Sequence, residues 1–286
     1  MSATLVIARL MLREVMRRRL VVALIALTLL AVALTAWGFS RIPTLSVRGV
    51  QIPEVQAKLI ASQLLILVMF MFSNVLALSA VFVASPALSA DLESGIALAM
   101  LSRPISRTEY VIGKWIGLAV LVIAYAVVAA TLELLAVNAV VAYLPPRPLE
   151  FLLLLIAEGL VLLTFGLLLS TRLSGMVGGV IALVLFGMAW LGGIVGGMGA
   201  AFDNELLERV GTATKLILPT DGLWRGAVYA LEPAAVLAGS LGAGPVTAAN
   251  PFYAATPPPV AFLLWCALWL LGMLALTVWS FSRREI

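Results

Sequence analysis

Two glutamates stand inside long apolar stretches of the sequence. Glu133 lies in the run 115–143 and Glu158 in the run 150–170, and neither run contains a lysine or arginine. A charge at the centre of a bilayer costs about 2.5–3.5 kcal/mol on insertion scales. We therefore expect these acids to line a hydrated pathway, or else to stay protonated or hydrogen-bond between helices. The candidate pathway residues at comparable depth are Gln63, Asn74, Glu133, Asn138 and Glu158.

Several kinds of chemistry do not fit the residue types present. The chain has no histidine, which excludes histidine-based zinc motifs and Ser–His or Cys–His pairs. Its single cysteine, Cys266, cannot form an intramolecular disulfide. The pair Gly113-Lys114 is followed by Trp115 and lacks the earlier glycine of a phosphate-binding loop. We expect no catalytic, cofactor-binding or metal-binding residues here, so ATP, if used, must bind another chain.

The composition places the chain in the membrane. Of 286 residues, 63% are hydrophobic and 11% are charged, against roughly 45–50% and about 25% in soluble domains. A helix needs about 20 apolar residues to cross a bilayer core. We predict an all-α integral membrane protein with six transmembrane helices, because six runs lack lysine and arginine. The runs are 20–39, 60–85, 115–143, 150–170, 176–200 and 260–281.

The basic residues predict the orientation. If the N-terminus is cytosolic, eleven of the 18 lysines and arginines fall in segments on the cytosolic side of the membrane. Positive charge near span ends favours the cytosolic side. We therefore expect both termini in the cytosol and the protein in the plasma or cytoplasmic membrane. The first run is longer than the apolar region of a signal peptide, so we expect it to remain as a span.

The N-terminal segment 2–19 is predicted to be an amphipathic helix. At 3.6 residues per turn its arginines form one stripe, opposite a face of aliphatic residues, which suits the headgroup boundary of a membrane. A simple basic flank that sets the topology is the alternative. The arginines of the stripe are Arg9, Arg13 and Arg17.

The connection 86–114 is the longest on the cytosolic side. Ser106-Arg-Thr-Glu109 matches a capping box, so a helix should begin at Ser106, before the bilayer, and continue into the third span. A short helix beside it would complete a rigid piece that transmits force between a soluble partner and the membrane.

Two further segments carry weaker signals. The fifth span has glycines at four-residue spacing, which allow close helix approach either between subunits or within one. The region 201–259 is predicted to be extracytoplasmic, with short helices on the outer rim or a re-entrant segment around 223–243. The packing glycines are Gly192, Gly193, Gly196 and Gly197.

The stretch from Asp91 to Lys114 resembles the loop between spans two and three of ABC-2 type transporter permeases. That family shows an acidic residue and a glycine before a Leu-Ser-x-Pro-Ile-Ser-Arg-x-Glu-Tyr-x-x-Gly-Lys pattern. The segment Leu218–Arg225 resembles the subgroup that includes the nitrous-oxide reductase maturation permease. The positions that fit the loop pattern are Glu93, Gly95, Leu101, Pro104, Arg107, Tyr110, Gly113 and Lys114.

The resemblance implies a function and partners. It implies the membrane-spanning permease of an ATP-binding-cassette exporter, paired with a second permease copy, identical or paralogous, and with two separate ATP-binding subunits that hold ATP and magnesium. It implies that 2–19 is an elbow helix, that 89–104 is a coupling helix, and that 171–175 makes a second contact. The ATPase-coupling residues would be Asp91, Glu93, Gly95, Leu101, Arg103, Pro104, Arg107, Glu109, Thr171 and Arg172.

Two other functions stay open at this point. A non-transporting anchor or regulatory subunit would need the coupling segment but no polar pathway, and Glu133 and Glu158 argue against it. An ion-driven carrier often has two related halves, and no convincing repeat is present. Nucleic-acid binding is not expected, because the net charge of +4 follows from the topology.

Overall fold

The computed structural model describes residues 3–16, 19–47, 50–102, 104–233, 236 and 250–284. Arg17 of the predicted elbow helix and Arg103 of the predicted coupling set lie outside these ranges. So does most of the second half of the predicted re-entrant segment 223–243.

Six helices in the described ranges are long and apolar enough to cross a membrane, which confirms the predicted number. They form because each is a run of strong helix formers and branched aliphatics with few charges. The second and third of these helices begin at Glu54 and Arg107, several residues before the apolar runs 60–85 and 115–143, so they extend beyond the predicted spans. The six are α2 (Arg19–Phe39), α3 (Glu54–Ala84), α6 (Arg107–Val141), α7 (Pro148–Ser170), α8 (Gly175–Ala201) and α13 (Val260–Ser282).

Shorter elements connect the long helices. After α2 the chain forms the 3-10 helix η1 (Ile42–Thr44) and a two-stranded antiparallel hairpin in which Ser46 pairs with Gln51 and Val47 with Val50. The remaining elements are α1 (Ala3–Met16), β1 (Ser46–Val47), β2 (Val50–Gln51), α4 (Ser89–Glu93), α5 (Ile96–Leu101), α9 (Glu205–Ile217) and α10 (Thr220–Leu231).

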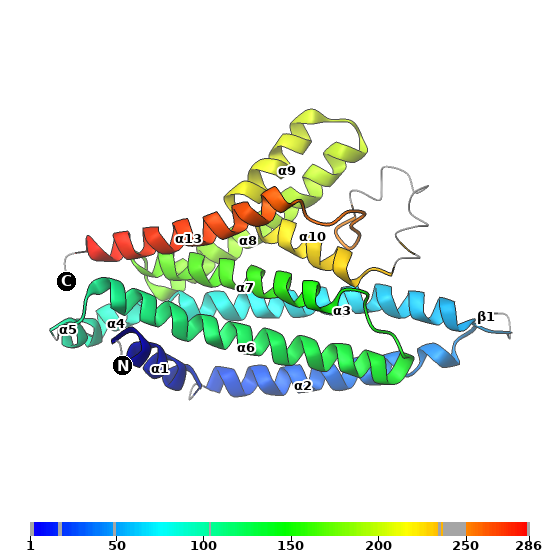
Figure 1. Ribbon diagram of the computed structural model, residues 1–286, viewed down its shortest axis with the longest axis horizontal. Helices are drawn as coiled ribbons and strands as arrows, with labels where there is room; N and C mark the ends of the chain where they lie inside the picture. Colours follow the sequence, from blue (N-terminus) through cyan, green and yellow to red (C-terminus); the bar gives the residue numbers. More distant parts are fainter. Residues whose placement is uncertain are drawn as a thin grey trace.

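The long helices run side by side in an elongated bundle with two distinct ends (Figure 1). Both ends of the chain lie with α1, α4 and α5 at one end, which we call the terminal end. The β1–β2 hairpin lies at the opposite end, which we call the loop end. The long helices run along the axis between these ends, except that α8 leans out of the bundle together with α9 (Figure 1).

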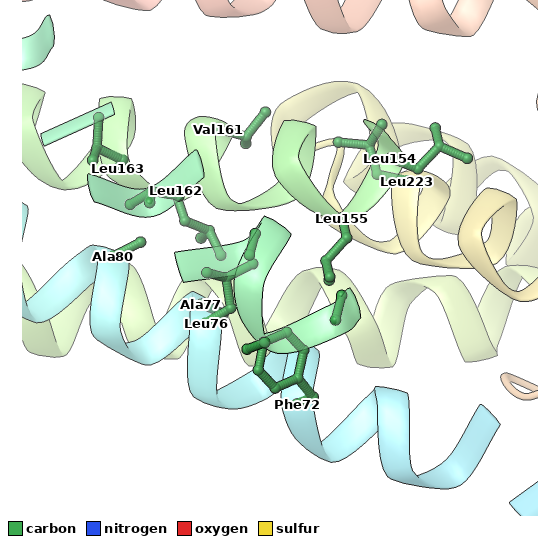
Figure 2. Close-up of a cluster of buried hydrophobic side chains, with 14 of the residues drawn as sticks. Phe72, Leu76, Ala77, Ala80, Leu154, Leu155, Val161, Leu162, Leu163 and Leu223 are labelled. Atoms are coloured by element: carbon green, nitrogen blue, oxygen red, sulfur yellow. The ribbon is translucent and has the colours of Figure 1, made fainter. Parts of the chain in front are cut away.

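Helix α7 is the centre of the bundle, since it packs against α3, α6, α8, α10 and α13. In its most apolar window 56% of the residues are buried, against 17% in the corresponding windows of α2 and α13. Figure 2 shows Leu76 and Ala80 of α3 beside Leu155 and Leu162 of α7, with Leu223 of α10 close by. Helices α2 and α13 are therefore peripheral and expose most of their apolar surface.

Helix α1 lies across the beginning of α6. A Cβ at Gly113 would come within 2.8 Å of the Ile7 Cβ, and one at Gly117 within 2.7 Å of the Ala8 carbonyl oxygen. These glycines therefore let the backbones meet, as small residues do between membrane helices. Met11 and Val15 complete the buried face of α1. The predicted apolar face exists, and it contacts α6.

Helices α9 and α10 meet at a turn beside α8, and we call this pair the α9–α10 hairpin, although α9 packs along α8 and contacts α10 only near the turn. Helix α9 returns along α8, where Gly196 and Gly211 meet backbone to backbone (Figure 1). At the turn, Trp269 Nε1 donates a hydrogen bond to the carbonyl oxygen of Ile217 (2.8 Å). Helix α10 then runs to the loop end, where the Tyr143 hydroxyl donates to the Leu231 carbonyl oxygen (2.8 Å).

The turn of this hairpin lies at mid-height in the bundle. Thr220 and Asp221 line the same small cavity as Glu158. Glu158 is ten residues beyond Pro148, where α7 begins, so at 1.5 Å per residue it lies about 15 Å along α7 from its first residue. That depth is about half of a bilayer core roughly 30 Å thick.

Candidate functional site

At the terminal end, α4 is fixed to the bundle by a buried ion pair. Lys114 Nζ lies 2.5 Å from Asp91 Oδ2 and also donates to the Ala87 carbonyl oxygen at 3.1 Å. The Tyr110 hydroxyl donates to the same Asp91 oxygen, and the Tyr110 ring stacks on Phe281 at a centroid distance of 5.6 Å. These contacts join α4 to α6 and α13 in one network.

A second connection joins α4 to α7. The Ser170 Oγ accepts hydrogen bonds from the backbone N–H groups of Leu88 and Ser89, both at 3.0 Å. Ser170 is fully buried at the end of α7. Because the first N–H groups of a helix have no partner within it, this hydroxyl fixes the start of α4 against the central helix.

The predicted coupling residues near the end of α13 bind that helix. Arg107 Nη1 donates to the carbonyl oxygens of Ser282 and Arg284, both at 2.7 Å. Arg172 donates from Nε to Ser280 Oγ and from Nη2 to the Ser280 carbonyl oxygen, both at 3.1 Å. Thr171 Oγ1 lies 2.8 Å from Ser280 Oγ. In this structure these side chains therefore make contacts within the chain.

The outer surface of α4 and α5 is exposed. Glu93 and Pro104 are exposed, whereas Asp91 is buried. Gly95 separates the two helices with φ +76°, a left-handed conformation that L side chains rarely adopt. Leu101 and Arg107 line an open cleft of about 850 Å³ between α5 and the start of α6. This is the surface on which a partner could bind.

The capping box predicted for α6 is confirmed. The Ser106 hydroxyl accepts from the Glu109 N–H at 3.1 Å, and the Ser106 N–H donates to Glu109 Oε2 at 2.9 Å. The two residues satisfy each other's backbone groups. Glu109 therefore has a structural partner at the start of α6.

Deeper in the bundle, Glu158 belongs to a buried polar cluster. Ser73 Oγ of α3 donates to Glu158 Oε2 at 2.8 Å, and both side chains are almost fully buried. They line a small cavity together with Trp190, Thr220 and Asp221. The cluster therefore joins α3, α7, α8 and α10 at the turn of the α9–α10 hairpin.

Asp221 carries the ion pairs of this cluster. Its Oδ2 lies 3.2 Å from Arg225 Nε and 3.8 Å from Lys215 Nζ. Arg225 Nη2 donates to the Gly193 carbonyl oxygen at 2.9 Å, which ties α10 to α8.

The other predicted pathway residues lie elsewhere. Glu133 is buried where α6 meets α2 and hydrogen-bonds Thr35. Asn74 Nδ2 donates to the Phe70 carbonyl oxygen of its own helix at 2.7 Å. Gln63 and Asn138 are exposed on the outside of the bundle. Within this single chain, the five predicted pathway residues therefore do not line one common site.

Three of the four predicted packing glycines face the α9–α10 hairpin. A Cβ at Gly192 would overlap Thr214, one at Gly193 would overlap the Asp221 carboxyl, and one at Gly196 would meet Gly211 at 2.7 Å. Gly197 is half-buried. Within this chain the glycines thus make room for the hairpin.

Sequence reasoning missed the partners contributed by other segments. Ser170 and Ser73 gave no signal, because single serines are common in membrane helices. Asp221 and Arg225 are spaced i, i+4, which predicts an ion pair along one helix face. That spacing could have marked them, although it could not have shown that they contact the cavity beside Glu158. Among the described residues, no cluster of acidic or cysteine side chains could hold a metal ion.

Comparison with known proteins agrees with this arrangement. Residues 5–286 match the model of the ABC-2 family transporter proteins. No curated protein matched the chain significantly. A match over nearly the whole chain, together with six helices able to cross a membrane, identifies a multi-pass membrane protein of a transport system. The chain belongs to the ABC-2 family of transporter proteins.

Proposed function

We propose that this protein is the permease subunit of an ATP-driven exporter. Two permease copies would assemble with two copies of a separate ATP-binding subunit, which bind and hydrolyse ATP with magnesium. Both termini and the terminal end would then face the cytosol. The proposal includes the subgroup of the nitrous-oxide reductase maturation permease, which the segment Leu218–Arg225 resembles.

The observation that carries the proposal is the attachment of α4. Its outward face is exposed. Its inward face contacts Lys114 of α6 and Ser170 of α7, and through the Tyr110 ring it is connected to α13. A displacement of α4 and α5 by a closing ATPase would therefore act on three spanning helices at once. A ligand shifts a conformational equilibrium only through its different affinity for the two states, and ATP on the partner would supply that difference.

Two features of the terminal end fit the other predicted contacts. The exposed arginines Arg9 and Arg13 on α1 suit a membrane surface. Thr171 and Arg172 follow α7 directly and bind the end of α13, so a second ATPase contact there would also act on α13.

The test is co-purification with the ATPase encoded beside the permease. Glu93→Arg reverses an exposed charge on α4, and Glu208→Arg reverses an exposed charge on α9 as the matched control. We expect Glu93→Arg to abolish the complex and Glu208→Arg to preserve it, with both variants correctly folded. Retention of the complex by both variants would remove α4 from the interface, and absence of an ATPase partner for the wild type would reject the proposal.

A second test concerns the buried acids. If they serve the cargo pathway, the double variant Glu133→Gln plus Glu158→Gln should impair cargo movement at normal expression. Single variants separate the two positions, because Glu133 contacts α2 whereas Glu158 contacts α3 and the α10 cavity. Unchanged transport by the double variant would assign both acids to helix packing.

A further inference from the structure

The cavity beside Glu158 contains polar atoms that lack partners. Trp190 Nε1, Thr220 Oγ1 and Asp221 Oδ1 are buried and form no hydrogen bond within the described part of the chain. Thr220 and Asp221 are 1% and 2% exposed. A buried donor or acceptor without a partner costs about 1–3 kcal/mol. Three such atoms around one cavity indicate an occupant that binds all of them.

Size and chemistry select water as that occupant. The space in the cavity that the centre of a water-sized sphere can occupy is about 10 Å³, against the roughly 10–15 Å³ that one water molecule needs, so nothing larger than one water molecule fits. Trp190 Nε1 can only donate, Asp221 Oδ1 accepts, and the Thr220 hydroxyl can do either. Buried water typically makes about three hydrogen bonds, which is the number that these atoms leave open.

The charges around the cavity indicate where a proton resides. Across the described ranges, no lysine or arginine forms an ion pair with Glu158, whereas Lys215 of α9 and Arg225 of α10 both pair with Asp221. Around the cavity, α3 and α8 contribute the uncharged Ser73 and Trp190. An ionised Glu158 would therefore lie unpaired next to another carboxylate, and the neutral form is favoured.

We propose that this cavity is a proton-binding site in which one bound water molecule joins Glu158 of α7 to Asp221 of α10. The water accepts from Trp190 and donates to Asp221 Oδ1. Glu158 can give its proton to the water while the water passes one of its own to Asp221. This transfer leaves the total charge of the cluster unchanged and moves the negative charge from Asp221 to Glu158.

The position of the proton then sets the strength of the hairpin contacts. When Asp221 is ionised, it holds Arg225 and Lys215, and Arg225 also binds the Gly193 carbonyl oxygen. When Asp221 is neutral, these cations lose their carboxylate partner. Loss of the proton to solvent instead leaves two carboxylates side by side, which repel each other. Both changes loosen α10 from α7 and α8, so the site is a proton-controlled contact of the α9–α10 hairpin.

The first experiment is infrared difference spectroscopy of the permease in lipid nanodiscs during a pH titration. A protonated carboxyl has a carbonyl stretching band separate from that of a carboxylate. We expect a band that is lost in Glu158→Gln and retained in Glu133→Gln, the matched buried acid. A spectrum from which Glu158→Gln removes no such band would overturn the proton assignment.

The water link is tested by the atoms that hold it. Trp190→Phe removes the N–H donor together with part of the ring, and Thr220→Val removes the hydroxyl while keeping the side-chain shape. We expect each to shift the frequency of the Glu158 band and its apparent titration midpoint. If both variants give the wild-type frequency and midpoint, Glu158 is protonated without the water link and this part of the proposal is rejected.

The conformational role is tested by hydrogen exchange. We expect the protection factors of the amides over residues 220–231, from which the intrinsic increase of exchange with pH is divided out, to fall as the pH rises in the wild type and to be independent of pH in Glu158→Gln. Equal pH dependence in both proteins would overturn the proton-controlled contact. None of these readouts uses transport or a partner, so they succeed or fail independently of the proposed export function.

Discussion

Two buried aspartates show how differently this chain treats charge in two regions. Asp91 at the terminal end binds Lys114 at 2.5 Å and also accepts from Tyr110. Asp221 at mid-height shares one oxygen between Arg225 at 3.2 Å and Lys215 at 3.8 Å, and its other oxygen is unpaired among the described residues. The first arrangement suits rigid transmission between helices. The second leaves an acceptor available for an exchangeable group.

The largest expected effect comes from breaking the rigid region. Lys114→Met keeps the aliphatic stem but leaves Asp91 buried without its cation, and removing one partner of a buried pair costs about 3–5 kcal/mol. Lys58→Met is the control, because Lys58 forms an exposed i, i+4 pair with Glu54 and such pairs contribute only about 0.3–0.5 kcal/mol. Thermal unfolding in detergent measures the stability of both variants. An equal loss of stability in the two would contradict the difference in burial between the two ion pairs.

The next effect concerns a third buried acid, Glu232 at the end of α10. Burial raises the pKa of this carboxyl to about 7 from the usual 4.5, and a hydrogen bond from the Ala254 backbone opposes the shift. Between about pH 4.5 and about pH 7, the folded state therefore keeps a proton on Glu232 that the unfolded chain has lost. Stability should therefore fall as the pH rises from about 4.5 to about 7, by about 3 kcal/mol in total.

Glu232→Gln should remove this pH dependence and increase the free energy of unfolding above pH 7. The measurement is chemical unfolding in detergent at a series of pH values. A wild-type profile that is flat between pH 5 and 8, or one that rises, would show that the folded state does not retain a proton on Glu232.

A smaller effect should follow from filling the glycine contact beside Asp221. Gly193→Ala places a Cβ where the Asp221 carboxyl lies, whereas a Cβ at Gly187 meets nothing within 4 Å. Overpacking typically costs about 1–3 kcal/mol, while alanine for glycine in an open helix gains about 0.5–1 kcal/mol. We expect opposite signs for the two variants in thermal unfolding, and matching signs would place Asp221 elsewhere.

The smallest effect tests the start of α6. Ser106→Ala removes the cap that Glu109 N–H uses and should cost about 1 kcal/mol. Ser102→Ala is the control, because the exposed Ser102 hydroxyl donates to the Ala99 carbonyl oxygen within its own helix α5. Most exposed substitutions change stability by less than about 0.5 kcal/mol. A loss for Ser102→Ala as large as that for Ser106→Ala would indicate that the cap contributes nothing specific.

Local patterns in the sequence predicted the local structure well. The six spans follow from apolar runs without basic residues, and the start of α6 follows from Ser106 and Glu109. The buried face of α1 follows from the spacing of Ile7, Met11 and Val15. Each of these features depends on residues that are close in sequence, so helix geometry alone relates them.

Contacts between distant segments could not be predicted in the same way. Nothing in the sequence pairs Asp91 with Lys114 or places Ser170 under α4, because these contacts depend on how the helices cross. Asp221 and Arg225 resembled the charges of an outer loop, yet the glycines of α8 admit them at mid-height. Gln63 and Asn138 have polar side chains within apolar runs, and both are exposed on the outside of this single chain.

The contact between α1 and α6 also orders the events of synthesis. Helix α1 is made first, but Gly113 and Gly117, on which it packs, follow about a hundred residues later. At roughly 5–20 residues per second, α1 spends several seconds without its partner. During that interval its face of Ile7, Met11 and Val15 has only the membrane surface to cover it. The ribosome must therefore complete two spans and begin the third before the first helix of the chain can reach its final place.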